Sequence, residues 1–217
     1  MIRSFIFLSL NSMKGTDSMN LSDMNIEVFR LINDLGKEHT VLNQVMIFIA
    51  EYMAYFLVAG VLVFWFIRGN HNRMFVVCGV ATLLLAEICG QTAGKLHSNK
   101  QPFAELENVN QLIEKAVDNS FPSDHTILFF SFCASFWLFN RGWGLLLIGV
   151  ASLVGVSRIW VGVHYPGDIL AAAILSIFSA IFVYKIVPKL HMTHKLLDFF
   201  RICDRMLLTI VSKPKGN

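Results

Sequence analysis

Charged residues are scarce in this sequence. Lysine, arginine, aspartate and glutamate together make up 15% of the 217 residues, whereas an ordinary soluble domain has about 25%. The formal net charge is only +3, and no arginine-rich patch is interleaved with aromatic residues. An ordinary soluble domain and a nucleic-acid-binding protein are therefore both excluded by composition.

Cysteine is also scarce. The four cysteines stand singly, three of them within apolar runs, and none forms a CxxC pair. They are Cys78, Cys89, Cys133 and Cys203. We interpret them as packing residues, because their spacing fits neither a metal-ligand pattern nor a disulfide framework. They do not identify a redox compartment.

Apolar residues take the place of the missing charge. Hydrophobic residues make up 55% of the chain, and the mean hydropathy is +0.57. Several apolar runs are long enough to cross about 30 Å of hydrocarbon. They cover residues 42–67, 74–96, 123–140, 143–161 and 168–187. The sequence predicts an all-α fold, a polytopic membrane helical bundle with five, or at most six, transmembrane helices.

The two ends of the chain differ from this membrane domain, which we place at residues 24–190. Residues 1–23 are expected to form a loose extension. Residues 24–35 carry apolar side chains on one helical side but are too short and charged to span, which favours an interfacial helix. Residues 191–217 mix leucine and phenylalanine with lysine and arginine, which predicts a basic amphipathic tail on the cytoplasmic leaflet.

Lysine and arginine near the span ends predict the orientation, because cytoplasmic loops are enriched in them. With five spans, one side collects most of these residues: Arg68, Arg73, Arg141, Lys185, Lys189, Lys195, Arg201, Arg205, Lys213 and Lys215. We assign that side to the cytoplasm. Residues 97–122 and 157–168 are then predicted to face the outside.

A helical hairpin is predicted to join two polar motifs. The segment "NSFPSDH" places Pro122 and Ser123 at a helix start, and 18 residues from there rise about 27 Å. The chain turns at "NRGWG", and the next apolar run returns to Ser157. His125 and Arg158 are therefore expected at the same membrane face.

The segment "SRIWVGVHYPGD" adds further polar side chains to this face, where they are costly unless they meet a cavity or a charged ligand. Arg158 offers a fork of donors for phosphate oxygens. His164 is a possible nucleophile whose imidazole Asp168 would orient. His125 could protonate a leaving oxygen, and backbone N–H groups at residues 123–125 could receive an anion. The set predicts phosphoryl transfer through a phosphohistidine, without a metal.

The spacing S-R-x5-H-x3-D, preceded by "PSDH" one hairpin earlier, resembles the membrane type-2 phosphatidic acid phosphatase family. The segments "AEY", "QPFAEL", "FPSDH" and "SRIWVGVHYPGD" are similar to the bacitracin-resistance type of undecaprenyl-diphosphatase. This resemblance covers residues 24 to about 190.

The resemblance implies a function and roles for the matching residues. The nucleophile, its partner and the general acid would be His164, Asp168 and His125, and the phosphate binders would be Ser123, Ser157 and Arg158. Undecaprenyl diphosphate would be dephosphorylated at the outer face of the bacterial membrane, which recycles the cell-wall lipid carrier and gives bacitracin resistance. The expected partners are an isoprenoid lipid diphosphate and membrane lipids, with no cofactor, no nucleic acid and no obligate protein partner.

The chain departs from the family's first motif, which is a lysine, six residues, and then Arg-Pro. Gln101 stands at the arginine position, and the six-residue spacing points back to Gly94 rather than to a lysine. Either Lys95 or Lys100, with His97, replaces the missing charge, or the phosphate is held with fewer cations. All three, together with Gln101, are candidate phosphate-binding residues.

Two other functions stay open at this point. The same chemistry could act on phosphatidylglycerol phosphate or phosphatidic acid, which the motifs do not distinguish. Alternatively, the carboxyl groups of Glu51 and Glu87 within spans could mark a permease component without catalysis. Release of phosphate from a lipid diphosphate by the purified protein discriminates the enzyme from the permease.

Overall fold

A computed structural model describes residues 20–67 and 69–211, and residues 1–19, 68 and 212–217 lie outside the description. The long helices are α2 (Leu21–Asn33), α4 (Thr40–Phe66), α5 (Asn70–Leu96), α7 (Asp124–Phe139), α8 (Arg141–Trp160), α9 (Pro166–Ile186) and α10 (His191–Val211). Short turns of helix form α3 (Leu35–Glu38), α6 (Pro102–Glu105) and η1 (Val187–Lys189). The described residues contain no strand, and the prediction of an all-α bundle is confirmed.

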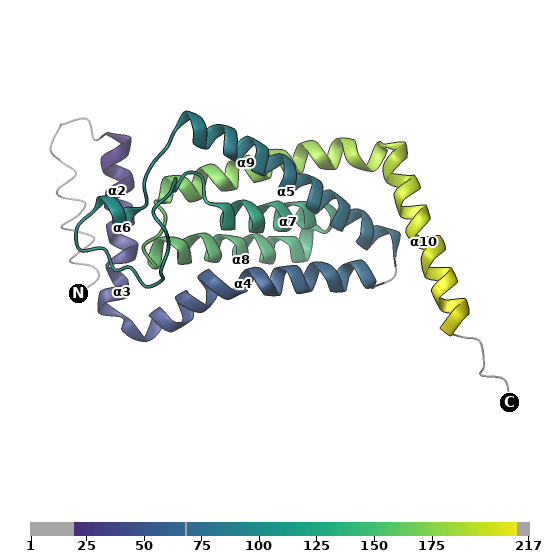
Figure 1. Cartoon of the computed structure of the whole chain (residues 1–217), viewed down its shortest axis with the longest axis horizontal. Coiled ribbons are helices and arrows are strands. Elements are labelled where there is room, and N and C mark those ends of the chain that lie inside the picture. Colours follow the sequence, from purple (N-terminus) through teal and green to yellow (C-terminus); the bar gives the residue numbers. More distant parts are fainter. Residues whose placement is uncertain (1–19, 68, 212–217) are drawn as a thin grey trace.

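Helix α7 forms the centre of the bundle. It packs against α4, α5, α8 and α9, which run along a common axis around it (Figure 1). Most of its side chains are buried, including three small polar ones. One of these, Ser135, donates its hydroxyl hydrogen to the hydroxyl oxygen of Thr82 on α5 at 3.0 Å. This short central helix carries the first site motif at its N-terminus.

Within residues 20–67 and 69–211, four helices are long and apolar enough to cross a membrane, namely α4, α5, α8 and α9. The fifth predicted span corresponds to α7, which has 16 residues and is therefore only about 24 Å long. Hydropathy found all five apolar helices, but it could not show that one of them is shorter and enclosed by the others. The chain is a membrane protein whose lipid-facing surface comes mainly from the outer four helices.

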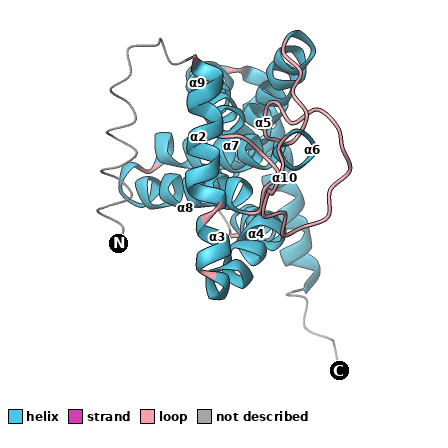
Figure 2. Ribbon diagram, turned by 90° about the vertical axis from the view of Figure 1, so that its left-hand side faces the viewer, coloured by secondary structure: helices cyan, strands magenta, loops and turns pink. Residues whose placement is uncertain are grey.

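Helix α2 lies across one end of the bundle (Figures 1 and 2). It begins at Leu21, three residues earlier than predicted, so the predicted loose extension is too long at its C-terminal end. Phe29 is fully buried against Ile159 and Tyr165. The remaining part of the extension, residues 1–19, lies outside the described residues. The predicted interfacial helix thus also packs on the segment that holds the second motif.

Helix α10 leaves the opposite end of the bundle at an angle (Figure 1). The ring of Phe200 meets that of Trp65 edge to face, with the centroids 4.9 Å apart. Asp204 forms an ion pair with Arg73 of α5. The C-terminal segment is therefore helical and docked on α4 and α5, while its position on a leaflet stays a prediction.

The connection between α5 and α7, residues 97–123, folds over the same end of the bundle as α2 (Figure 2). We call this segment the capping loop. The backbone N–H of Leu112 donates to the carbonyl oxygen of Val161 at 3.2 Å, and Asn33 of α2 donates to the carbonyl oxygen of Asn110 at 3.0 Å. The loop is held in place by the elements that carry the second motif.

Candidate active site

The turn between α8 and α9 places His164 at the capped end of the bundle. Gly162 has a φ of +86°, a conformation that favours glycine. A side chain there would also come within 2.9 Å of the Asn110 carbonyl oxygen. Two residues after His164, α9 begins with a capping box in which Asp168 Oδ2 accepts the Tyr165 N–H at 2.9 Å. The tight turn and the cap together fix the position of the imidazole.

The hydrogen bonds of His164 define its tautomer. The side chain is only 3% exposed. Its Nδ1 lies 3.0 Å from the backbone oxygen of Ser120 and 3.5 Å from Oδ2 of Asp168. Both neighbours are acceptors, so Nδ1 carries the hydrogen and Nε2 has the lone pair. The candidate nucleophilic atom is therefore Nε2, on the opposite side of the ring from the Nδ1 that faces Asp168.

Asp168 supports His164 in combination with Ser120. Its Oδ2 accepts the hydroxyl hydrogen of Ser120 as well as the Tyr165 N–H. The carboxylate is buried, and its Oδ1 has no hydrogen-bond partner within the described residues. The predicted pairing of His164 with Asp168 is thus present at 3.5 Å, and the Ser120 carbonyl is the nearer acceptor. A positive charge forming on the imidazole would face both.

Arg158 is held in place by one hydrogen bond, while another N–H of its guanidinium has no partner among the described residues. It lies in the last turn of α8 and is 4% exposed. Its Nη1 donates to the Ala50 carbonyl oxygen on α4 at 3.0 Å. Its buried Nε has no partner in the described part of the chain, which costs about 1–3 kcal/mol for an unsatisfied donor. An anion with several acceptor oxygens would remove that cost.

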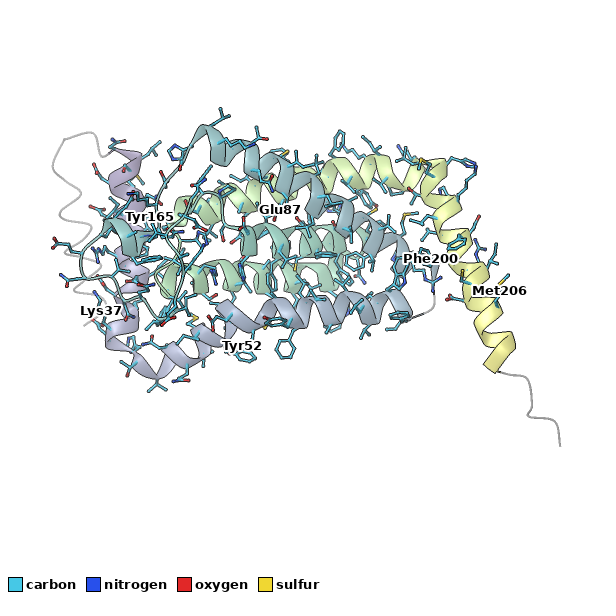
Figure 3. All side chains as sticks on the ribbon, in the orientation of Figure 1. Lys37, Tyr52, Glu87, Tyr165, Phe200 and Met206 are labelled. Carbon is cyan, nitrogen blue, oxygen red and sulfur yellow. The ribbon has the colours of Figure 1, made fainter. Side chains whose placement is uncertain are left out.

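His125 lies in the first turn of α7 and is half-buried. It faces the positive charges of Arg158 and Lys115 and the ring of His164. The N-terminal end of α7 and the C-terminal end of α8 are therefore together, as the hairpin prediction required. Figure 3 shows Tyr165 at this end of the bundle and Phe200 at the other.

The electrostatic environment keeps His164 neutral. Burial is the main cause that lowers the pKa of His164, and the charges of Lys115 and Arg158 lower it further. The hydrogen bond and the charge of Asp168 oppose this effect. A neutral imidazole is the nucleophilic form. The site is therefore electropositive and holds its candidate nucleophile in the reactive protonation state.

The residues that build this site match a known family. Residues 75–192 match the PAP2 superfamily. The chain belongs to this superfamily. The match begins in α5, contains α7, α8 and α9, and includes the candidate catalytic residues. The resemblance to the type-2 phosphatidic acid phosphatases is thereby confirmed.

Two curated PAP2 relatives extend over almost the whole chain. "Bacitracin transport permease protein BcrC" of Bacillus licheniformis is 50% identical over 92% of this chain and 97% of its own length. "Undecaprenyl-diphosphatase BcrC" of Bacillus subtilis is 31% identical over 88% of this chain and 97% of its own length. The crystal structure of Aquifex aeolicus LpxE has a TM-score of 0.65 and 26% identity, covering 77% of this chain and 99% of that one.

Two predicted phosphate-binding serines of this PAP2 chain are buried beside the site. Ser123 precedes α7, and its backbone N–H lies 3.4 Å from the Asp168 carbonyl oxygen. Its Oγ accepts the hydroxyl hydrogen of Thr126 at 3.1 Å. Ser157 donates its hydroxyl hydrogen to Val154 within α8 at 2.7 Å. Both positions suit a structural role at the helix ends, and direct phosphate binding by either hydroxyl stays a prediction.

The four candidates near the first PAP2 motif occupy different environments. Lys95, His97 and Lys100 are exposed. Gln101 is fully buried, and its amide donates to the carboxylate of Asp118 and accepts the Asp118 N–H at 3.1 Å. No hydrogen bond or ion pair of the described residues joins these four to His164 or Arg158. Phosphate binding by them stays a prediction, and Gln101 acts in the structure as a clamp on the capping loop.

Two residues of the capping loop were missed by the sequence interpretation. Ser120 contacts both Asp168 and His164, and the Lys115 ammonium lies 3.5 Å from Nε2 of His164. The available signal was the length of the loop, because connections longer than about 12–15 residues are usually functional or disordered. Lys115 belongs to none of the motifs by which the site was found, and Ser120 lies in the segment "NSFPSDH" but was given no role there.

Proposed function

We propose that this protein dephosphorylates undecaprenyl diphosphate to undecaprenyl phosphate through a phosphohistidine on His164. The observation that carries the proposal is the lone pair on Nε2 of His164, in a buried site that also contains Arg158 with an unused donor. The name of the Bacillus subtilis relative supports the choice of lipid. Alternative lipids with the same phosphate chemistry are outcomes of the test.

In the first step, Nε2 of His164 attacks the terminal phosphorus. The new N–P bond forms as the bridging P–O bond breaks, and the lipid phosphate leaves with the electron pair. Arg158 binds oxygens of the transferred group, while the Ser120 carbonyl and Asp168 face the positive charge that forms on the ring. The leaving phosphate has a second pKa of about 6, so it needs little protonation from His125.

In the second step, water attacks the phosphohistidine. An O–P bond forms, the N–P bond breaks, and its electron pair returns to Nε2. His125 accepts a proton from the attacking water and returns it to the phosphate as that phosphate is released. Inorganic phosphate is released and both histidines regain their starting states. Apart from water, these two reaction steps use only side-chain and backbone groups of the described residues.

We place the site at the outer face of the bacterial membrane, where it would recycle the lipid carrier and give bacitracin resistance. The distribution of charge supports this orientation. The end opposite the site carries the basic residues Arg73, Arg141, Lys185, Lys189, Lys195 and Arg201. In a variant without its native cysteines, Ser98→Cys should react in intact cells with a membrane-impermeant maleimide. Labelling only after cell lysis would show that this end of the bundle faces the cytoplasm instead.

The name of the Bacillus licheniformis relative favours a second candidate, a permease component. A permease would not require an activated histidine, so a kinetic test separates the two. Purified protein in detergent is given undecaprenyl diphosphate, and inorganic phosphate is measured.

The proposal requires multiple turnovers by the native protein and a loss on the order of 10⁴-fold or more for His164→Ala. Protein quenched in alkaline detergent after incubation with substrate labelled in the terminal phosphate should carry label that is stable to alkali and lost in acid, and His164→Ala should lack it. Substantial activity in His164→Ala would refute the phosphohistidine, and no release by the native protein would favour the permease. Phosphatidylglycerol phosphate and phosphatidic acid, assayed in parallel, decide the lipid.

A further inference from the structure

One cation of the capping loop enters the candidate active site. Lys115 has a side chain that is 26% exposed. By contrast, Lys95 in the last turn of α5 and Lys100 at the start of the capping loop are exposed residues. The Nζ of Lys115 lies 3.5 Å from Nε2 of His164 and 3.9 Å from the carboxylate of Asp118. The ammonium therefore reaches the atom that would attack phosphorus.

The tautomer of His164 decides which of the two groups, Lys115 Nζ or His164 Nε2, is the hydrogen-bond donor. Nδ1 carries the hydrogen, because it faces the Ser120 carbonyl and Asp168. Nε2 therefore offers its lone pair, and an ammonium hydrogen of Lys115 is the donor. A phosphorus atom in attacking position lies about 3–3.5 Å from the nucleophile. Its oxygens would then be within hydrogen-bond reach of the same ammonium.

Hydrogen bonds hold the loop on both sides of Lys115. Before it, the N–H of Leu112 donates to the Val161 carbonyl oxygen at 3.2 Å. After it, Asp118 is clamped by Gln101 in both directions. The position of Lys115 thus follows from two anchors of the loop, one on the α8–α9 turn and one at the start of α6.

The end of α5 is shaped to fit this loop. Asn119 donates its side-chain amide to the carbonyl oxygens of Gly94 at 3.1 Å and Phe121 at 2.9 Å. A Cβ at Gly94 would come within 2.7 Å of the Phe121 carbonyl oxygen. A side chain at this position would displace the loop segment that leads to His125. The space beside α5 is therefore filled by the capping loop, and the cation comes from Lys115.

We propose that Lys115 is a catalytic residue that binds the phosphoryl group under transfer, with its ammonium moving from His164 Nε2 onto a phosphate oxygen when the lipid diphosphate enters. This inference rests on the proposed function. The chain then has two cations at the reacting phosphate, Arg158 from α8 and Lys115 from the capping loop. The second compensates for the absence of a positive side chain at Gln101.

The charges around the lysine support this exchange. Burial lowers the pKa of Lys115, and Arg158 lowers it further, while the carboxylates of Asp118, Asp124 and Asp168 raise it. An incoming diphosphate adds negative charge beside the amine and would stabilise its protonated form. Substrate binding and the charge of Lys115 are therefore mutually reinforcing.

The test compares Lys115→Met and Lys115→Arg in purified protein, by kcat and KM for phosphate release from undecaprenyl diphosphate. Lys115→Met should lower kcat/KM by about 10²–10³-fold, as loss of one donor to a reacting oxygen does. Lys115→Arg should retain much of the activity, because it keeps the charge and the donors. Lys185→Met, at the opposite end of α9, has the same charge change and should stay within about twofold.

Three further measurements exclude a structural cause. The inhibition constant of inorganic phosphate should rise in Lys115→Met and not in Lys185→Met. The pKa of His164 should also rise in Lys115→Met, because one of the positive charges facing it is lost while Arg158, His125 and Asp168 remain. A midpoint of thermal unfolding equal to that of the native protein would show that folding is intact.

The outcomes separate this inference from the proposed function. An active native protein with an inactive His164→Ala and a Lys115→Met within twofold of native would overturn the role of Lys115 alone. A large loss in Lys95→Met or Lys100→Met, with Lys115→Met active, would assign the cation to the first-motif segment instead. An inactive native protein would refute the proposed function itself.

Discussion

The two halves of the bundle are built by different interactions. At the capped end, buried polar residues form a connected set of hydrogen bonds, in which Ser120, His164 and Asp168 each have a defined partner. The other half contains an apolar cavity of about 600 Å³ between α4, α5, α7 and α8. Its lining consists almost wholly of apolar and aromatic side chains, together with the backbone of Gly60.

This difference follows from the directionality of the interactions. A hydrogen bond weakens steeply as its distance and angle change, so each polar group at the capped end has one workable position. Apolar contacts are non-directional, and lipid is as apolar as leucine. The capped end should therefore be sensitive to single atoms, and the cavity should tolerate added volume.

The largest effect is expected at Arg158. Arg158→Lys keeps the charge but loses the planar fork, so kcat/KM should fall by about 10²–10³-fold. Kinetics of phosphate release with undecaprenyl diphosphate would measure it. Arg201→Lys on α10, which has an exposed ion pair with Asp198, is the matched control and should be unchanged. A fully active Arg158→Lys would mean that only charge is needed at this position.

Ser120→Ala should give an intermediate effect. It removes the hydroxyl donor to Asp168 and keeps the backbone carbonyl that faces His164. Because a hydrogen bond to a charged group contributes about 1.5–3 kcal/mol, kcat should fall by about 10- to 100-fold. Ser152→Ala, which loses an exposed hydroxyl bonded within α8, is the control. Equal kcat values in the two variants would show that Asp168 is oriented without Ser120.

A smaller contrast is expected in the titration of His164. An ordinary histidine with a pKa of about 6.5 would be roughly three-quarters protonated at pH 6. The pKa of His164 is lowered by burial, so a smaller fraction of its ring should be protonated at that pH. Nitrogen NMR of histidine-labelled protein, assigned with His164→Ala, would report this. Protonation with an ordinary midpoint would contradict the buried, electropositive environment.

The same pKa shift has a consequence for stability. A lowered pKa means that the unfolded chain binds more protons than the folded one below about pH 6.5. The contribution of His164 to the free energy of unfolding should therefore fall as the pH is lowered through that range. Thermal unfolding between pH 7.5 and 5.5 should show a smaller pH dependence for His164→Ala than for the native protein.

The smallest effect is expected in the apolar cavity. A Cβ at Gly60 would meet no atom within 4 Å, and the cavity of about 600 Å³ beside it has room for more atoms. Gly60→Leu should therefore leave kcat/KM within about twofold. Gly144→Ala is the contrasting variant, because its Cβ would lie 2.3 Å from the Cα of Trp137. It should clearly lower the midpoint of thermal unfolding. A tenfold rise in KM for Gly60→Leu would place the lipid tail in the cavity and break the comparison.

The polar motifs were the most predictable part of the site. Arg158 lies in the last turn of α8, His164 in the turn that follows, and Asp168 in the first turn of α9. Their proximity therefore follows from local geometry. The approach of His125 was also predictable, since two helices of similar length joined by a tight turn return to the same face. Lys115 and Ser120 were not predictable in this way, because nothing in a loop's own sequence sets where it crosses a helix end.

Composition and the period of apolar residues by themselves determined the all-α membrane bundle, because lipid requires every spanning backbone group to be satisfied within helices. They also determined the two motifs and the hairpin that joins them. Only the tertiary structure decided that α7 is the enclosed helix, that Gln101 clamps Asp118 and that a loop lysine reaches His164. These features depend on contacts between residues far apart in the chain, which no local pattern encodes.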